Sequence, residues 1–189
     1  GVFFPQAFGF KREIDVILFF HGFKQGEYYN VKTIDYYWSG RFQNLTLRED
    51  VNASGKSVVL IAPMLGDKPG SVQTADMGVF RNPGGGDLFL DSVREWIGKS
   101  VPQYKERGLT PSVRNVILAG HSGAGVILDI QARSMKANVC EVWGFDSLYG
   151  QSAFQRNVVQ DWLDAANQRP ATKFFFSSTS ETKDNALEL

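Results

Sequence analysis

The most informative segment of the chain reads Asn115-Val-Ile-Leu-Ala-Gly-His-Ser-Gly-Ala-Gly125. Its first half is an unbroken apolar run, typical of a strand buried on both faces of a sheet. Its second half gathers small residues around Ser122, and a segment with helical spacing follows. Small residues are needed where a strand turns sharply into a helix, because the two elements pass close together there. The segment therefore predicts a strand, a tight turn at Ser122 and a helix.

The same alternation of strand and helix runs through the whole chain. Short runs rich in Val, Ile and Phe predict five strands, at Asp15–Phe20, Ser57–Ala62, Asn115–Ala119, Val139–Phe145 and Lys173–Ser177. Helical spacing predicts helices over Asp87–Lys99, Ala124–Lys136 and Phe154–Asn167, the first with Asp87 as its N-cap. Because no linker or internal repeat interrupts this order, we expect one domain over residues 1–189. Its predicted fold is a doubly wound, mostly parallel α/β sheet.

Composition excludes several classes of function. The 189 residues carry 20 Lys and Arg against 20 Asp and Glu, and this zero net charge argues against nucleic acid as a partner. The longest apolar runs, such as Val16–Phe20, are far too short to span a membrane. A lone Cys140 excludes an intrachain disulfide and a multi-cysteine zinc site. His21 and His121 are the only imidazoles available for acid–base chemistry.

In doubly wound sheets the ligand site lies beyond the carboxyl ends of the strands. Three predicted strands end in residues with chemical potential: His21-Gly-Phe23, the turn at Ser122, and Asp146. The turn would place the Ser122 hydroxyl above the sheet, at the positive end of the following helix. The Gly123 N–H would then point toward an oxyanion that forms there.

At these positions the chain resembles the α/β-hydrolase family of serine esterases and lipases, and the resemblance covers nearly all of its length. Gly120-His-Ser-Gly-Ala124 is similar to the family's nucleophile turn, with Ala124 in place of the usual Gly. The resemblance implies that Ser122 is the nucleophile. It also implies that Phe23, the residue after His-Gly, donates a second N–H to the oxyanion. The run Leu47–Pro63 looks like the next helix and strand of esterase-like members.

Two other interpretations of the turn remain open. Gly120-x-x-Gly123-x-Gly125 is close to some dinucleotide-binding turns, which cradle a phosphate at a helix N-terminus. The spacing, however, is not Gly-x-Gly-x-x-Gly, and the turn follows a middle strand instead of the first one. A purely structural turn is the third interpretation.

A serine nucleophile also needs an acid that orients a general base. Asp146 follows the predicted strand Val139–Phe145 in an apolar context, and some lipase-like members of the family place the acid there. The commoner placement, one strand later, would select Glu181 or Asp184. We favour Asp146, and a turn or N-cap role is its structural alternative.

The base has no obvious candidate. In the family the histidine follows the acid, but no histidine follows residue 121 here. We expect His121 to project away from the nucleophile and His21 to shape the oxyanion loop, so both histidines are interpreted as structural. Three explanations remain: a chain that is truncated before the fold is complete at its C-terminal side, a non-catalytic relative, or a base from His21 or another subunit. Loss of a triad histidine lowers turnover by roughly 10⁶-fold.

The sequence thus predicts a serine hydrolase that acts on an ester or related acyl bond, with a truncated or non-catalytic hydrolase-fold binding protein as the alternative. A small-molecule acyl substrate is implied, and neither a cofactor nor a metal is. A truncated sheet would leave an edge or an apolar face uncovered, which favours a homodimer. The segment Gly1-Val-Phe-Phe-Pro5 does not resemble a signal peptide, and this favours a cytoplasmic location.

Overall fold

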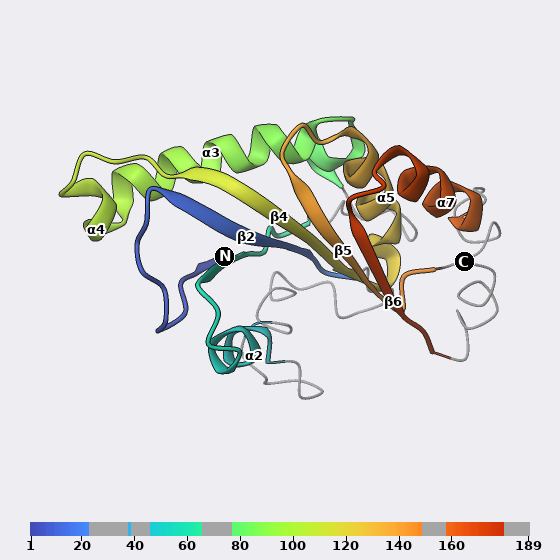
Figure 1. Cartoon of the computed structure of the whole chain (residues 1–189), viewed down its shortest axis with the longest axis horizontal. Helices are drawn as coiled ribbons and strands as arrows, with labels where there is room; N and C mark the ends of the chain where they lie inside the picture. Colours follow the sequence, from blue (N-terminus) through green and yellow to red (C-terminus); the bar gives the residue numbers. More distant parts are fainter. Residues whose placement is uncertain (23–37, 39–45, 66–76, 149–157, 180–189) are drawn as a thin grey trace, which may run out of the picture.

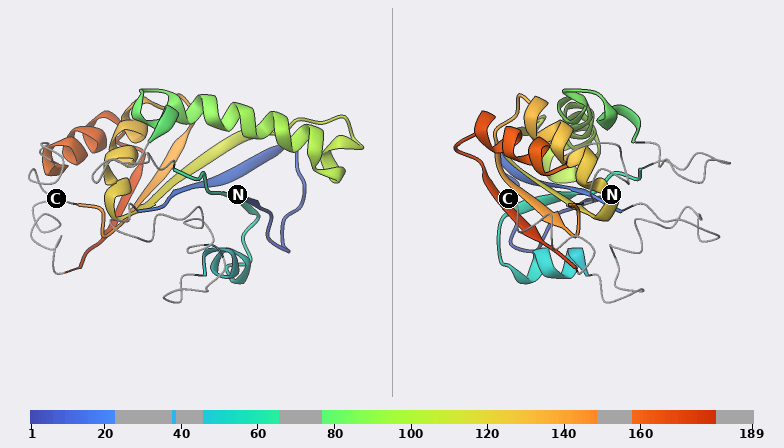
Figure 2. Two further views of the ribbon diagram at one scale, coloured as in Figure 1. Left: turned by 180° about the vertical axis from the view of Figure 1, so that it is seen from behind. Right: turned by 90° about the vertical axis from the view of Figure 1, so that its right-hand side faces the viewer.

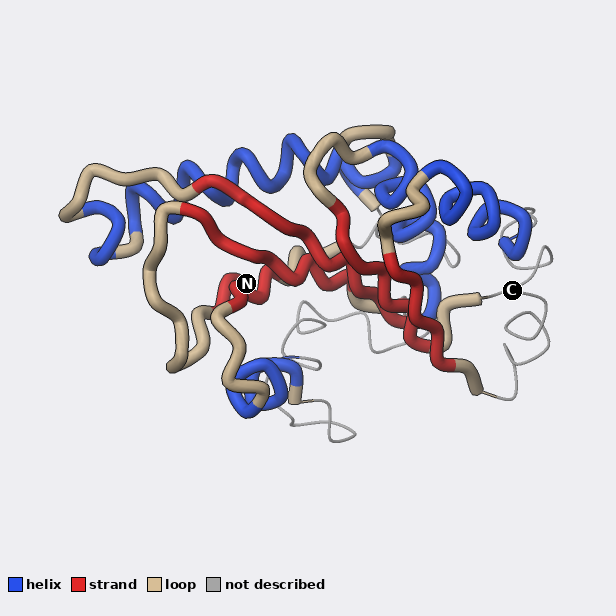
Figure 3. Tube along the Cα trace, viewed as in Figure 1, coloured by secondary structure: helices blue, strands red, loops and turns tan. Residues whose placement is uncertain are grey.

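The computed structural model describes residues 1–22, 38, 46–65, 77–148 and 158–179. Within these ranges six strands form one sheet with the order β1-β3-β2-β4-β5-β6 (Figures 1 and 3). They are β1 (Val2–Phe3), β2 (Glu13–Phe20), β3 (Val58–Ile61), β4 (Ser112–His121), β5 (Val139–Phe145) and β6 (Lys173–Ser177). The strands from β3 to β6 run parallel, and only the short β1 pairs antiparallel, with β3.

Helices cover both faces of this sheet. They are α2 (Leu47–Ala53), η1 (Gly78–Arg81), α3 (Gly85–Ser100), α4 (Pro102–Lys105), η2 (Ser122–Ala124), α5 (Gly125–Ser134) and α7 (Val158–Gln168). The helices α3, α5 and α7 lie on one face, whereas α2 lies on the other (Figures 1 and 2). This arrangement confirms the predicted doubly wound, mostly parallel α/β sheet. No helix in the described part of the chain is long and apolar enough to cross a membrane.

The five predicted strands all form, and two details of the sequence prediction are corrected. β4 extends beyond the predicted run Asn115–Ala119 at both ends. The helix α3 begins at Gly85, so Asp87 is not its N-cap. The Asp87 carboxylate instead accepts hydrogen bonds from the backbone N–H groups of Lys136 (2.8 Å) and Ala137 (3.0 Å), after α5. Its role is thus to tie α3 to the segment that leads into β5.

The strands bury alternate side chains against the two layers of helices. In β2, Val16, Leu18 and Phe20 belong to the larger hydrophobic core, together with residues of α3 and α5. Ile17 and Phe19 point to the other face, toward the smaller cluster that contains Val51 of α2. Both sets are buried, which explains why the strand reads as one apolar run in the sequence.

A buried glutamine fastens α5 to the segment before α3. The side chain of Gln131 is fully buried and accepts a hydrogen bond from the Gly86 N–H (2.8 Å). Its amide nitrogen donates to the carbonyl oxygens of Phe80 (2.6 Å) and Asn82 (3.0 Å). These bonds satisfy backbone groups of the η1 segment, which would otherwise be costly to bury. The C-terminal half of the helix that follows Ser122 is therefore tied to η1 and to the start of α3.

Candidate active site

Ser122 and Asp146 lie at the same level on two neighbouring strands. The last paired residue of β4 is His121, opposite Phe145 of β5. Ser122 and Asp146 are therefore the first residues beyond the paired part of strands that run about 4.8 Å apart. Both have positive φ angles, 55° for Ser122 and 48° for Asp146. Such backbone strain in residues other than glycine is uncommon and concentrates at functional sites.

Glycines on either side of Ser122 make the tight turn possible. A side chain at position 120 would come within 3.0 Å of Leu128 and 3.1 Å of the Ala124 Cβ, because α5 passes directly over the end of β4. A side chain at position 125 would collide with the carbonyl oxygen of Ser147. Gly125 therefore allows the start of α5 to touch the residue after Asp146. This contact joins the Ser122 turn to the Asp146 turn.

The ends of β2 and β4 also meet at Gly22. A side chain there would lie 2.8 Å from the Ser122 Cβ and 2.9 Å from the His121 Nδ1. The backbone at the exit of β2 thus approaches the Ser122 side chain closely. Gly123 is buried in η2 at the N-terminal end of the helical run that continues into α5. Phe23, the other predicted oxyanion donor, lies outside the described residues.

The Asp146 carboxylate is anchored to the end of β6. The backbone N–H of Asp146 donates to the carbonyl oxygen of Ser177 (2.8 Å), one step beyond the last strand pairing. Its Oδ1 accepts hydrogen bonds from the Thr179 N–H (3.1 Å) and the Thr179 hydroxyl (2.6 Å). The structure therefore holds this half-buried carboxylate in a defined orientation. The alternative acids, Glu181 and Asp184, lie outside the described residues.

His21 is a structural residue, as expected. Its ring is buried, and its Nε2 accepts a hydrogen bond from the Leu65 N–H (2.9 Å). Because a backbone N–H can only donate, Nε2 carries no proton, so Nδ1–H donates to the Gly22 carbonyl oxygen (2.9 Å). Burial also lowers the pKa of His21, which favours this neutral form. Both ring nitrogens are occupied, so His21 cannot take a proton from Ser122 without losing these bonds.

His121 is the last residue of β4. Its side chain lies on the same face of the sheet as that of Ala119, which is the face beside α2. It is half-buried, and this burial lowers its pKa, whereas the negative charge of Asp146 acts to raise it. The opposing influence of Asp146 places the carboxylate within electrostatic range of the His121 ring. The prediction that His121 points away from the Ser122 hydroxyl stays a prediction.

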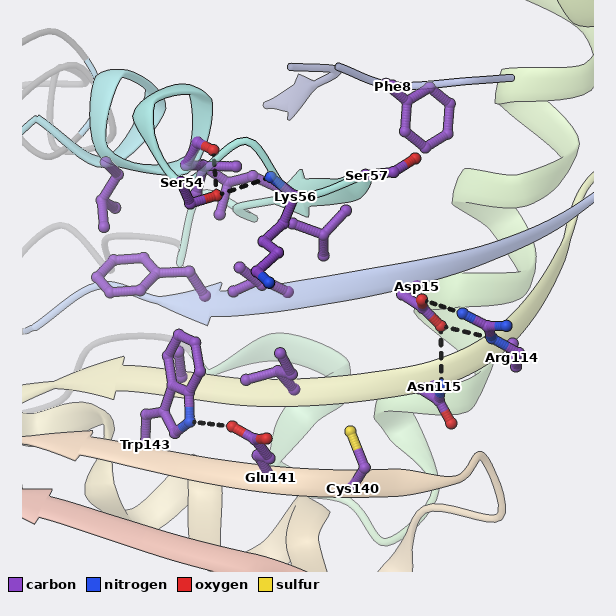
Figure 4. Close-up of a pocket in the computed structure, with 18 of the residues that line it drawn as sticks. Phe8, Asp15, Ser54, Lys56, Ser57, Arg114, Asn115, Cys140, Glu141 and Trp143 are labelled. Atoms are coloured by element: carbon purple, nitrogen blue, oxygen red, sulfur yellow. Dashed lines mark hydrogen bonds and ion pairs between the residues drawn. The ribbon is translucent and has the colours of Figure 1, made fainter. Parts of the chain in front are cut away.

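A cavity of about 1010 Å³ does not coincide with this site. It lies on the face of the sheet beside α2, and its apolar floor includes Ile17, Ile117 and Trp143. Figure 4 shows its polar wall, where Arg114 pairs with Asp15 and the Trp143 indole donates to Glu141 (2.8 Å). The Ser122 turn does not line this cavity, so we place the candidate active site at the strand ends instead.

Sequence reasoning missed three supporting contacts. Leu65 donates to His21 through its backbone N–H, a bond that no residue type could have indicated. Thr179 contacts Asp146 across 33 positions of sequence, and a threonine after a strand carries no signal by itself. The contact of Gly125 with Ser147 did have a signal, because a second glycine directly after the turn indicates a close approach.

Comparison with known proteins supports the fold. No protein-family model and no curated protein matches the chain. Among solved structures, a ferulic acid esterase superposes with a TM-score of 0.60 at 16% sequence identity, over 99% of this chain and 75% of the esterase. LpqC, a poly(3-hydroxybutyrate) depolymerase from Bordetella parapertussis, gives a TM-score of 0.41 at 10% identity, over 99% of this chain and 79% of LpqC. The mixed sheet, its helices and the superposition on the ferulic acid esterase together show that the chain has an α/β-hydrolase fold.

Proposed function

We propose that the chain is a serine hydrolase that acts on an ester or related acyl bond, with Ser122 as the nucleophile. The observation that carries this proposal is the φ angle of 55° at Ser122, directly beyond β4 and beside glycines that leave no room for side chains. A turn of this kind exposes a serine hydroxyl at the carboxyl edge of a hydrolase sheet. A purely structural turn gains nothing from such strain at a serine.

In the proposed reaction the Ser122 Oγ attacks the carbonyl carbon of the substrate while a base accepts the hydroxyl proton. The tetrahedral intermediate then collapses, and the leaving alcohol takes that proton from the base. Water hydrolyses the resulting acyl-enzyme and regenerates the serine. Backbone N–H groups of Gly123 and Phe23 would stabilise the negatively charged oxygen of the intermediate, helped by the positive end of the helix.

Asp146 is proposed to orient the base. The position of Asp146 beside Ser122, at the same level of the sheet, supports this role. The two hydrogen bonds of His21 argue against it as the base, and His121 is predicted to point away from the Ser122 hydroxyl, so the imidazole is proposed to come from outside the 189 residues. The same observation on His21 favours one alternative function: a hydrolase-fold protein that binds an acyl compound without turning it over.

Small acyl esters are the proposed substrates. The superposed protein is named a ferulic acid esterase, so esters of ferulic acid belong in the first set of compounds to test. Simple aryl acetates belong there too, because their good leaving groups make acylation of a serine easy to observe. Hydrolysis of these esters by a serine nucleophile requires no cofactor.

Burst kinetics would test the proposal. With p-nitrophenyl acetate, and with imidazole added as the base, we expect a burst of p-nitrophenol that approaches one equivalent of protein above the background of imidazole alone. Slow turnover should follow, because the good leaving group makes acylation faster than deacylation. Ser122→Ala should abolish the burst, whereas the matched variant Ser147→Ala should retain it. A burst of the same size in Ser122→Ala would overturn the assignment of the nucleophile. A folded wild-type protein without any burst would favour the binding alternative.

A further inference from the structure

Thr179 contacts the proposed catalytic acid in a way that its own strand does not require. We propose that Thr179 is a positioning residue that orients the Asp146 carboxylate toward the base of the Ser122 site. This inference rests on the proposed function, because it assigns Thr179 a task only if Asp146 orients a base.

The two hydrogen bonds from Thr179 converge on a single oxygen. The hydroxyl donates to Asp146 Oδ1 at 2.6 Å and the backbone N–H donates to the same atom at 3.1 Å. A hydroxyl–carboxylate distance this short is typical of a charge-assisted bond. Two donors on one oxygen fix the rotation of the carboxylate about its Cβ–Cγ bond. The direction that the group presents to a neighbouring imidazole is thereby fixed as well.

Other contacts already hold the Asp146 turn in place. The backbone N–H of Asp146 bonds to the Ser177 carbonyl oxygen, and the next residue, Ser147, is 3% exposed and packs against Gly125. Removal of the Thr179 hydroxyl should therefore leave the backbone where it is. The hydroxyl bond itself is exposed to solvent, so its contribution to stability is small. What it determines is the orientation of the carboxylate.

The chain offers a matched control at the other end of the same strand pair. The hydroxyl of Thr172 donates to the carbonyl oxygen of Val139 (2.7 Å), where β5 begins and just before β6 starts. This bond also links β5 to β6, but it lies far from the carboxyl ends of the strands. Thr172→Val removes one hydroxyl bond without affecting the proposed site.

The test follows covalent labelling of Ser122 by a fluorophosphonate, detected by intact mass, with and without added imidazole as the base. We expect Thr179→Val to lower the imidazole-dependent labelling rate by about tenfold or more, because a misdirected carboxylate holds imidazole poorly. The imidazole-independent rate and the melting temperature should hardly change. Thr179→Ser should restore the rate, and Thr172→Val should leave it at the wild-type value.

The possible outcomes separate the role of Thr179 from the proposed function. If Asp146→Asn loses imidazole-dependent labelling but Thr179→Val does not, the role of Thr179 is refuted and the proposed function stands. If Thr179→Val and Thr172→Val lower the rate equally, the bond is structural and the positioning role is again refuted. If Asp146→Asn labels like wild type, Asp146 does not orient the base and the role of Thr179 is refuted with it. If Ser122 is not labelled at all, the proposed function itself fails.

Discussion

Gly125 shows how closely the two strand ends of the candidate site fit together. Its neighbour is the backbone carbonyl of Ser147, which cannot rotate away as a side chain could. A methyl group at position 125 must therefore push the start of α5 away from the turn at Asp146. The relative placement of Ser122 and Asp146 therefore depends on the absence of a side chain at position 125.

We predict that Gly125→Ala destabilises the fold by about 1–3 kcal/mol or more, the usual cost of overpacking. Chemical denaturation would measure the change in the free energy of unfolding. Gly9→Ala is the control, because a Cβ at position 9 meets only the Lys11 side chain, at 3.6 Å. Equal stability of the two variants would contradict the close contact between Gly125 and Ser147.

The lowered pKa of His21 predicts that the stability of the protein depends on pH. Burial lowers its pKa below the ordinary value of 6.5, so the unfolded chain takes up a proton at higher pH than the folded chain does. The contribution of His21 to stability is therefore complete above pH 6.5 and is lost as the pH falls below that value. His121, whose pKa is also lowered, acts in the same direction.

Melting temperatures measured from about pH 8 to about pH 5 would check this sign. Wild type should lose stability as the pH falls. His21→Gln should be less stable at the upper end but should lose less on acidification, since it cannot be protonated. A fall of the same size in His21→Gln would show that other groups cause the pH dependence.

At the level of elements, the sheet could be predicted from the sequence and the links between helices could not. The apolar run Val16–Phe20 is buried on both faces, and that burial leaves a direct mark on residue type. Gln131 leaves no such mark, because its three partners are backbone groups some 50 positions away. Asp87 was misinterpreted for the same reason: its partners are distant backbone N–H groups instead of its own helix.

We predict that Gln131→Ala lowers the free energy of unfolding by about 2–4 kcal/mol, since it removes the hydrogen bonds of the side-chain amide to the buried Gly86 N–H and Phe80 carbonyl oxygen. Gln160→Ala is the control. The Gln160 side chain is exposed and bonds to Asp164 within α7, so its loss should cost no more than about 0.5 kcal/mol. Denaturation curves that shift equally for both variants would contradict the proposed role of the buried amide.

At the scale of the whole molecule, the two faces of the sheet differ. Among the residues that the structure describes, the α2 face carries two exposed aromatic side chains, Phe145 (40% exposed) on β5 and Phe175 (51% exposed) on β6. Trp143 pairs with Phe175 in the register and also lines the cavity on this face. Parallel sheets in α/β proteins are normally covered on both faces. The sequence predicted a homodimer, and this patch is where we expect the contact.

Sedimentation at increasing concentration would detect such a dimer. We predict that wild type self-associates and that the double variant Phe145→Ser with Phe175→Ser does so less. Leu88→Ser is the control, because Leu88 is 64% exposed on α3, on the opposite face. A wild type that stays monomeric up to about 100 µM would refute the prediction, since stable interfaces associate well below that concentration.

The candidate site was only partly predictable at this scale. Ser122 and Asp146 could be placed because each directly follows a strand, and the carboxyl ends of parallel strands meet at one edge. The structural role of His21 was expected, but the hydrogen bonds that hold its ring could not be predicted, because one of them comes from the Leu65 backbone, 44 positions away. This long-range contact removes one of only two histidines from the chemistry.

Covalent modification of Ser122 tests the central claim most directly. The folded protein would be incubated with a fluorophosphonate in the presence of imidazole, and the adduct located by peptide mass mapping. We predict one adduct, on Ser122, that forms faster as imidazole is added and is absent in Ser122→Ala. A folded protein that forms no adduct, or forms it on another residue at the same rate in Ser122→Ala, would contradict the assignment of Ser122 as a nucleophile.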